Sequence, residues 1–187
     1  MTDDLTRYLN MLGWNTVPKE RERESDQLSA YRRSLFFPEL LYQLGLSPHR
    51  EKRFLMKIEA QDQGVDYPVE FKIVQKYGCA FRILTPPDEL LLAMKFCALL
   101  GRAKGRDLYD IVFLMSQGIV PDLDFLRQKR SDITSLEQLY KISLDVLQRE
   151  DPALKIRDVE HLLINPIERQ RIALLPDILR DECSRLS

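Results

Sequence analysis

The chain has 187 residues and a formal net charge of −1, with 44% hydrophobic and 30% charged side chains. This composition is typical of a soluble, globular chain that forms one domain or two small ones. The balanced charge excludes a protein that binds nucleic acid or membranes through an overall basic surface, so any nucleic-acid contact would need a local basic patch.

The first elements predicted along the chain are a helix and a short strand. Apolar residues follow helical spacing over 5–12, and Gly13 is the stop signal after them. Residues 14–18 then predict a short strand. The charge run at 19–25 predicts a loop or a strand edge in contact with water.

A second helix is predicted from the segment SLFFPELLYQLGLS, residues 34–47. Ser34 is a suitable N-cap residue, and Gly45 is a suitable residue to end the helix. Pro38 fits the first turn, where the missing backbone N–H costs nothing. We therefore expect a capped helix over this whole segment.

Three segments with apolar residues at alternate positions predict strands over 53–61, 67–75 and 79–86. Turn-forming residues separate them. Because these strands are close together in sequence, at least one pair is expected to be antiparallel. The segment 53–85 is thus predicted to form a small mixed sheet.

After the Pro86–Pro87 pair, the apolar spacing changes to the helical period. The predicted helices cover 88–103, 106–117, 122–130, 134–149, 156–163 and 166–186. Thr85 or Asp88 is expected to cap the first of them. The fold class predicted from these patterns is α+β, with an α/β region over 1–86 and a helical region over 87–187.

The cysteine pattern and the N-terminus predict a cytoplasmic protein without a membrane partner. The three cysteines are widely spaced and form no Cys-x-x-Cys pair, which disfavours a zinc site or a disulfide framework. The first residues, MTDDLTRYL, lack the basic start and apolar core of a signal peptide. The longest apolar run is far too short to span a bilayer.

One apolar segment carries a single charge and is followed by a cluster of charges. Ten of the eleven residues of Leu90–Leu100 are apolar, and the exception is Lys95. Five charged residues then occupy nine positions: Arg102, Lys104, Arg106, Asp107 and Asp110. Because an unpaired buried ammonium group is costly, we predict that the Lys95 amine meets Asp107 or Asp110, or opens into a phosphate-sized cleft. The segment 101–105 would be the turn that folds the second helix back against the first.

Residue types alone leave two interpretations of this cluster open. In the first, salt bridges tie two helices together, and Lys95 extends its aliphatic stem along apolar surface to reach water. In the second, Lys95, Arg102 and Arg106 form a basic cluster that binds phosphate. Asp107 and Asp110 would then orient these cations.

The same residues carry a resemblance to a known family. The spacing Lys-x6-Arg-x-Lys-x-Arg-Asp-x2-Asp over residues 95–110 resembles the last signature of the AbiEii/AbiGii nucleotidyltransferase-toxin family. The strand segment MKIEAQ and the helical segment DVEHLLINPIERQRIALLPDIL also resemble parts of that family. The resemblance covers most of the chain.

The resemblance implies a nucleotidyltransferase fold and a toxin that acts together with an antitoxin. It implies a nucleoside triphosphate as substrate, Mg²⁺ ions held by strand acids, and an acceptor that could be RNA. Glu59 resembles one metal-binding acid. The implied catalytic residues are Glu59, Lys95, Asp107 and Asp110, and the implied phosphate-binding residues are Lys95, Arg102, Lys104 and Arg106.

The sequence departs from the family pattern at the principal metal-binding acids. It contains no Gly-Gly or Gly-Ser dipeptide, and its only Asp-x-Asp, at 122–124, follows the signature. We therefore expect a truncated nucleotidyltransferase-like sheet and a chain that is incomplete or inactive by itself. The alternative is a non-catalytic remnant of the fold that binds a nucleotide or a protein and needs no cofactor.

Overall fold

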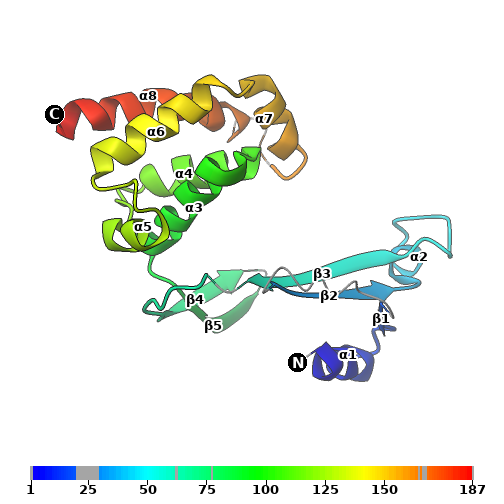
Figure 1. Ribbon diagram of the computed structural model, residues 1–187. Helices are drawn as coiled ribbons and strands as arrows, with labels where there is room; N and C mark the ends of the chain where they lie inside the picture. Colours follow the sequence, from blue (N-terminus) through cyan, green and yellow to red (C-terminus); the bar gives the residue numbers. More distant parts are fainter. Residues whose placement is uncertain are drawn as a thin grey trace. The chain divides into compact units, whose positions relative to one another are not determined.

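The computed structural model describes residues 2–19, 30–61, 63–76, 78–163, 165 and 168–186. The chain divides into two compact units, Met1–Gly64 and Val65–Ser187 (Figure 1). The first unit contains a three-stranded antiparallel sheet, and the second contains a two-stranded antiparallel sheet followed by helices. The predicted α+β fold class is therefore confirmed.

The first unit is a small sheet with two short helices. Its described elements are α1 (Thr2–Met11), β1 (Val17–Pro18), β2 (Ala30–Phe37), α2 (Leu40–Gln43) and β3 (Phe54–Gln61). Both strand pairs, β1–β2 and β2–β3, are antiparallel. Gly13 has a φ of +87° directly after α1, so the predicted helix stop is confirmed. The charge run predicted at 19–25 lies, after Lys19, outside the described residues.

The helix predicted over 34–47 is wrong for most of that segment. Its first four residues belong to β2, and the helical turn is confined to Leu40–Gln43. Leu35 and Phe37 alternate along the strand and are 0% and 5% exposed. Pairing with the apolar strand β3 therefore outweighs the local helical spacing. Ser34 consequently lies within a strand and caps no helix.

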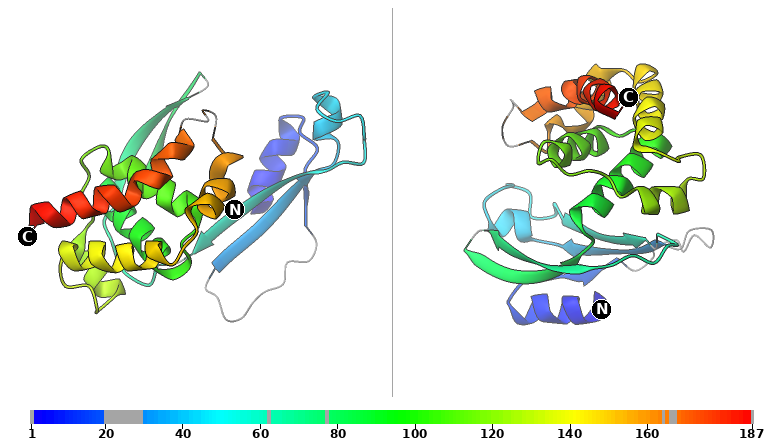
Figure 2. Two further views of the ribbon diagram at one scale, coloured as in Figure 1. Left: turned by 90° about the horizontal axis from the view of Figure 1, so that it is seen from above. Right: turned by 90° about the vertical axis from the view of Figure 1, so that its left-hand side faces the viewer.

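The second unit consists of one hairpin and a set of packed helices. Its elements are β4 (Glu70–Lys76), β5 (Cys79–Thr85), α3 (Asp88–Arg102), α4 (Gly105–Met115), α5 (Leu123–Lys129), α6 (Leu136–Gln148), α7 (Pro152–Glu160) and α8 (Arg169–Leu186). The hairpin lies along one side of the helices, and α8 packs against α4 and α6 (Figures 1 and 2). The change to helices after Pro87 is confirmed. None of the helices in the described residues has the length and hydrophobicity that crossing a bilayer requires.

The single mixed sheet predicted over 53–85 is wrong, because its strands belong to two antiparallel sheets. The strand at 53–61 pairs with β2 in the first unit. The other two strands pair with each other as the β4–β5 hairpin, which confirms one antiparallel pair. A tight turn that includes Gly78, with a φ of +76°, connects these two strands.

The predicted side-chain cap of the first long helix is also wrong. The N-cap position of α3 is Pro87, and no side chain accepts a hydrogen bond there. The Thr85 hydroxyl donates instead to the Pro86 carbonyl at 3.1 Å, and the Asp88 carboxylate pairs with Lys72 of β4. Asp88 therefore links the hairpin to the start of α3.

The apolar run of α3 forms the centre of the core of the second unit. Core side chains with 0–2% exposure include Leu92, Phe96, Leu99, Ile111, Leu126, Leu139, Tyr140, Leu175 and Leu179. Burying each such side chain contributes roughly 1.5–3 kcal/mol. Burial also raises the pKa of the Tyr140 phenol to about 12. The apolar side of α3 is therefore buried in this core, as its sequence predicts.

Ser143 of α6 is a polar exception in this core. Its side chain is fully buried, and its hydroxyl has no hydrogen-bond partner among the described residues. An unsatisfied buried polar group costs about 1–3 kcal/mol, so Ser143→Ala is expected to raise the free energy of unfolding by roughly 0.5–1 kcal/mol. Urea denaturation measures the change. The matched control is Ser116→Ala, because that exposed hydroxyl donates to the Phe113 carbonyl at 2.7 Å and its removal brings no such gain. A loss of stability in Ser143→Ala would show that the Ser143 hydroxyl makes a hydrogen bond that stabilises the protein.

Candidate functional site

The residues of the charged cluster lie at the joint between α3 and α4. After Arg102, Ala103 adopts the left-handed conformation with a φ of 43°, and its N–H donates to two carbonyls of the last turn of α3 at 3.1 and 3.3 Å. Lys104 is extended, and α4 begins at Gly105. The predicted turn at 101–105 is therefore confirmed, although its left-handed residue is alanine. It lets α4 pack against α3.

Arg102 and Asp107 form a bidentate ion pair across this turn. The Arg102 Nε and Nη2 atoms each donate to one carboxylate oxygen of Asp107 at 2.8 Å. The Asp107 side chain is 0% exposed, whereas that of Arg102 is 47% exposed. Burial alone would raise the pKa of Asp107, but the hydrogen bonds and positive charge of Arg102 outweigh burial, so the pKa lies below its ordinary value. Asp107 is thus an ionised, buried acceptor.

Lys95 reaches the second acid of the cluster. Its Nζ atom lies 2.6 Å from Asp110 Oδ2, and the two side chains are 34% and 37% exposed. This contact confirms the prediction that the amine meets Asp107 or Asp110. The pair, about one-third exposed, lies at the surface of the α3–α4 contact, where water can reach it.

The N-terminal end of α4 is already occupied by a carboxylate of the chain itself. The Gly105 N–H donates to Asp158 Oδ2 of α7 at 3.0 Å. A Cβ added at Gly105 would lie 2.0 Å from the Lys155 carbonyl oxygen, so only glycine allows α7 to approach this closely. A helix N-terminus usually attracts anions. Here Asp158 fills that position, and the adjacent Lys104 side chain is exposed.

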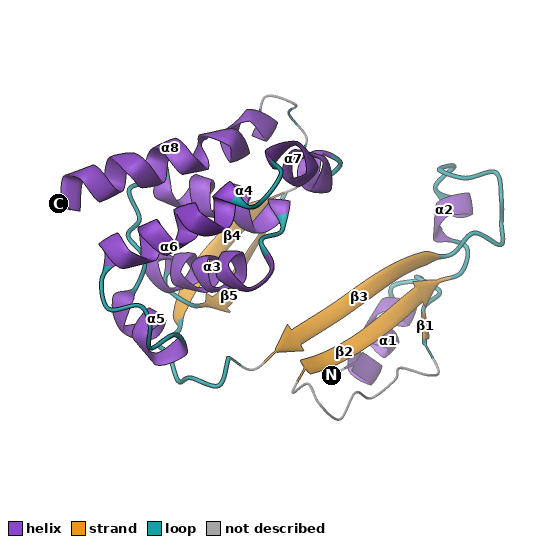
Figure 3. Cartoon of the chain, turned by 45° about the horizontal axis from the view of Figure 1, so that its top comes forward, coloured by secondary structure: helices purple, strands orange, loops and turns teal. Residues whose placement is uncertain are grey.

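A cavity of about 380 Å³ opens beside the outer side of α4. It is lined by Arg106, Tyr109, Asp110, Val159, Leu162, Leu163, Asn165 and Glu168. These residues come from α4, α7 and the segment that leads to α8, and α4 packs against α7 and α8 (Figure 3). The cavity therefore combines an apolar wall with three charged side chains.

The two acids of the cavity have cationic partners, whereas its arginine has none in the described part of the chain. Asp110 pairs with Lys95, and Glu168 pairs with Arg171 at 2.8 Å. The Tyr109 hydroxyl donates to Glu168 at 3.1 Å, and burial followed by this hydrogen bond raises the pKa of Tyr109. No ion pair is found for Arg106 among the described residues, so its guanidinium remains available to an anion from solution.

The remaining predicted site residue belongs to the first unit. Glu59 belongs to β3 in the first unit, where it is exposed and lies opposite Arg32 of β2. Of the Asp-x-Asp at 122–124, Asp122 caps α5 by accepting from the Phe125 N–H at 2.8 Å, and Asp124 pairs with Arg127. No three acids, histidines or cysteines within the described ranges lie close enough together to hold a metal ion. These residues do not fit a Mg²⁺ site, and the metal role of Glu59 stays a prediction.

A comparison with protein families finds a match that covers nearly the whole chain. The sequence profile described as "Nucleotidyl transferase AbiEii toxin, Type IV TA system" matches residues 11–185. The chain belongs to the AbiEii family. No curated protein and no solved structure matches the chain. The predicted resemblance is confirmed, and the cluster of 95–110 lies within the residues matched to this family, which is described as nucleotidyl transferase toxins of type IV toxin–antitoxin systems.

The sequence analysis did not single out two acids that contact α4, Asp158 and Glu168. Both lie in the segment 158–179, which resembled the family but received no functional assignment. Their partners are distant in sequence, because Asp158 bonds to Gly105 and Glu168 bonds to Tyr109. The family resemblance of this segment was the signal available for finding them.

Proposed function

We propose that this AbiEii-family toxin binds a nucleoside triphosphate in the cavity beside α4, with Arg106 as the principal phosphate ligand. In the complete reaction the nucleotide is transferred to an acceptor, for which RNA is the expected class, and a cognate antitoxin protein limits the activity. The observation that carries the proposal is the position of Arg106. It is a signature arginine that lines the cavity together with two acids that already have cationic partners.

The chemistry of the cavity suits a nucleotide. A guanidinium group donates two parallel hydrogen bonds to phosphate oxygens, which makes arginine a preferred phosphate ligand. The ring of Tyr109 and the side chains of Leu162 and Leu163 offer an apolar wall for a base or sugar. A volume of about 380 Å³ lies within the range of small-ligand sites.

The other signature residues are proposed to have different roles. Lys95 holds Asp110 at the edge of the cavity, where the ammonium group offsets the repulsion between the Asp110 carboxylate and a bound phosphate. Asp107 has no exposed surface, and we therefore assign it and Arg102 the role of fixing the α3–α4 turn. Lys104 is exposed beside Arg106 and supplies a second positive charge to a long phosphate chain.

Binding and transfer are separate parts of this proposal. Transfer of a nucleotidyl group by this family is expected to require Mg²⁺. Because the described acids do not gather into a metal site, we expect the chain by itself to bind the triphosphate without robust transfer. Non-catalytic nucleotide binding is accordingly the second candidate function.

The test of binding is a titration of the chain with each nucleoside triphosphate in the presence of Mg²⁺. Arg106→Gln is expected to weaken binding about 10-fold or more, because a charge-assisted hydrogen bond contributes roughly 1.5–3 kcal/mol. The matched control is Arg180→Gln on α8, whose partner Asp177 lies on the same exposed surface of that helix. Equal affinity of Arg106→Gln and the unaltered chain would contradict the proposed site.

A second arm of the same experiment separates the two candidate functions. The unaltered chain and the variants Arg106→Gln, Arg180→Gln and Glu59→Ala are each incubated with labelled triphosphate, Mg²⁺ and bulk RNA. Binding without incorporation supports the non-catalytic role of this chain. Incorporation that is lost in Arg106→Gln and in Glu59→Ala, but kept in Arg180→Gln, supports transfer by the chain and shows that the acids predicted to be missing are not required.

A further inference from the structure

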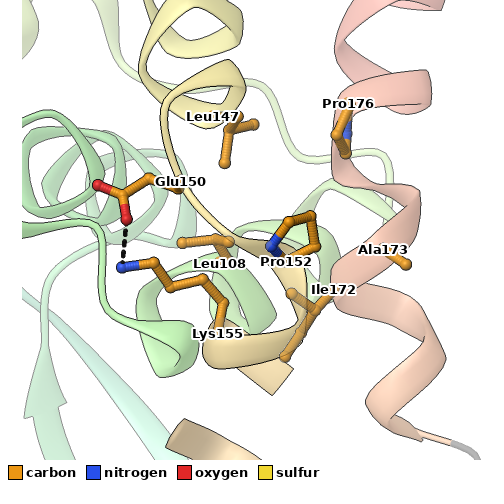
Figure 4. A pocket seen from close by; sticks show the side chains of 8 residues that line it. All are labelled: Leu108, Leu147, Glu150, Pro152, Lys155, Ile172, Ala173 and Pro176. Carbon is orange, nitrogen blue, oxygen red and sulfur yellow. Dashed lines mark ion pairs between the residues drawn. The ribbon is translucent and has the colours of Figure 1, made fainter. Parts of the chain in front are cut away.

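A second, smaller cavity lies on another side of α4 and shares no lining residue with the proposed nucleotide site. Its volume is about 140 Å³. It is lined by Leu108, Leu147, Glu150, Pro152, Lys155, Ile172, Ala173 and Pro176. Figure 4 shows Leu147 above, Leu108 and Pro152 below, and α8 with its three residues on the right. Its walls are therefore mainly aliphatic.

Pro176 interrupts the hydrogen bonding of α8 at the wall of this cavity. Proline has no backbone N–H, so the Ile172 carbonyl, four residues earlier, lacks the donor that an uninterrupted α-helix would supply. Ile172 is only 2% exposed, so water has little access to that carbonyl. Both residues line the cavity, so a carbonyl without its i+4 donor belongs to the helix segment that forms the apolar wall.

The opposite side of the cavity has a polar rim. Lys155 Nζ lies 2.7 Å from Glu150 Oε2, and the two side chains are 17% and 34% exposed. Figure 4 shows this pair beside Leu108. Because the amine and the carboxylate neutralise each other, the rim favours a neutral ligand over a phosphate or carboxylate.

We propose that this cavity binds a small neutral aromatic molecule with one hydroxyl or N–H donor, of the phenol class. The volume supports a single ring, since a dry aliphatic cavity of about 150 Å³ in another protein accepts benzene. The ring would contact Leu108, Leu147 and Pro152, and the donor would bond to the Ile172 carbonyl. A nucleoside triphosphate does not fit, because the cavity is too small and carries no unpaired cation.

The direct test is a titration of the full chain with phenol and with benzene, followed by nuclear magnetic resonance of the leucine methyl groups. Both probes are expected to bind, with phenol roughly 3- to 10-fold tighter, because it supplies one extra hydrogen bond. Leu147→Phe fills the cavity and is expected to abolish binding of both probes. The matched control is Leu144→Phe, which enlarges a half-buried leucine of the same helix that does not line the cavity.

Pro176→Ala tests the hydrogen-bonding part separately. Alanine restores a backbone N–H for the Ile172 carbonyl, so phenol is expected to lose its advantage over benzene while benzene still binds. The proposal is overturned if neither probe binds at millimolar concentration. It is also overturned if Leu147→Phe binds phenol like the unaltered chain, or if Pro176→Ala keeps the full preference for phenol.

Discussion

Replacing Gly105 by alanine is expected to destabilise the second unit by roughly 3 kcal/mol or more. The new Cβ would lie 2.0 Å from the carbonyl oxygen of Lys155 and 3.0 Å from its carbonyl carbon. These atoms belong to the backbone of α7, so they cannot move aside as a flexible side chain would. The helices α4 and α7 would have to separate, which breaks the 3.0 Å hydrogen bond from Gly105 N–H to Asp158.

A nearby glycine supplies the matched control for this substitution. Gly101 lies inside α3, and a Cβ added there would meet no atom within 4 Å. Gly101→Ala is therefore expected to stabilise the protein by about 0.5–1 kcal/mol, because alanine favours a helix more than glycine does. Urea denaturation of both variants gives the comparison. Similar stability of Gly105→Ala and the unaltered protein would show that α7 does not pack on the start of α4 as described.

Arg102→Met is expected to reduce the free energy of unfolding by about 3 kcal/mol at neutral pH. The methionine keeps much of the aliphatic stem but removes both hydrogen bonds to Asp107. The Asp107 carboxylate, 0% exposed, would then remain buried without its principal partner. Leaving the buried Asp107 charge without a partner costs more free energy than removing the partly exposed charge of Arg102 itself. The loss of stability is therefore caused by the unpaired aspartate.

The pH dependence of the stability of Arg102→Met tests whether the buried charge of Asp107 causes the loss. In the unaltered protein the pKa of Asp107 is lowered from 3.8, because Arg102 outweighs the effect of burial. A carboxyl group with a lowered folded-state pKa stabilises the protein above its unfolded-state value, and this contribution is lost as the pH falls through the folded-state pKa. In Arg102→Met, burial is no longer opposed by Arg102. The stability difference between variant and unaltered protein should therefore shrink as the pH is lowered through the carboxyl range, and it should be smallest below the lowered folded-state pKa of Asp107 in the unaltered protein.

Lys95→Met is the control for the exposed pair of the same cluster. Lys95 and Asp110 are each about one-third exposed, so this substitution is expected to cost less than about 1 kcal/mol. The double variant Arg102→Met with Asp107→Leu should recover most of the loss, because it removes the buried charge together with its partner. Equal losses in Lys95→Met and Arg102→Met would contradict the assignment of Asp107 as the buried, structural acid.

Local patterns were sufficient to predict several features of this protein. The helices after Pro87 follow from apolar residues at the 3.6-residue period, which the chain displays without reference to any distant partner. The contact of Lys95 with an acid follows from the cost of burying its charge next to Asp107 and Asp110. Family membership follows from the spacing of the charged residues over 95–110, and the family comparison confirms it.

Other predictions failed or were incomplete because their outcome depends on partners far away in sequence. The segment at 34–37 has helical spacing and suitable caps, but pairing with β3 makes it a strand. The local sequence also does not show that Arg102 pairs with Asp107 and that this acid is buried. The burial of Asp107 results from the packing of α4 on the core.

The sequence alone therefore determined the family, the helical half of the fold and the pairing of Lys95 with an acid, because each depends on neighbouring residues or on charge. Only the tertiary structure decided which residues surround Arg106. Glu168 reaches Tyr109 across 59 positions of sequence, and Asp158 reaches Gly105 across 53. Such contacts exist only when α7 and α8 pack against α4, since local spacing carries no information about which distant helix will cover an exposed face.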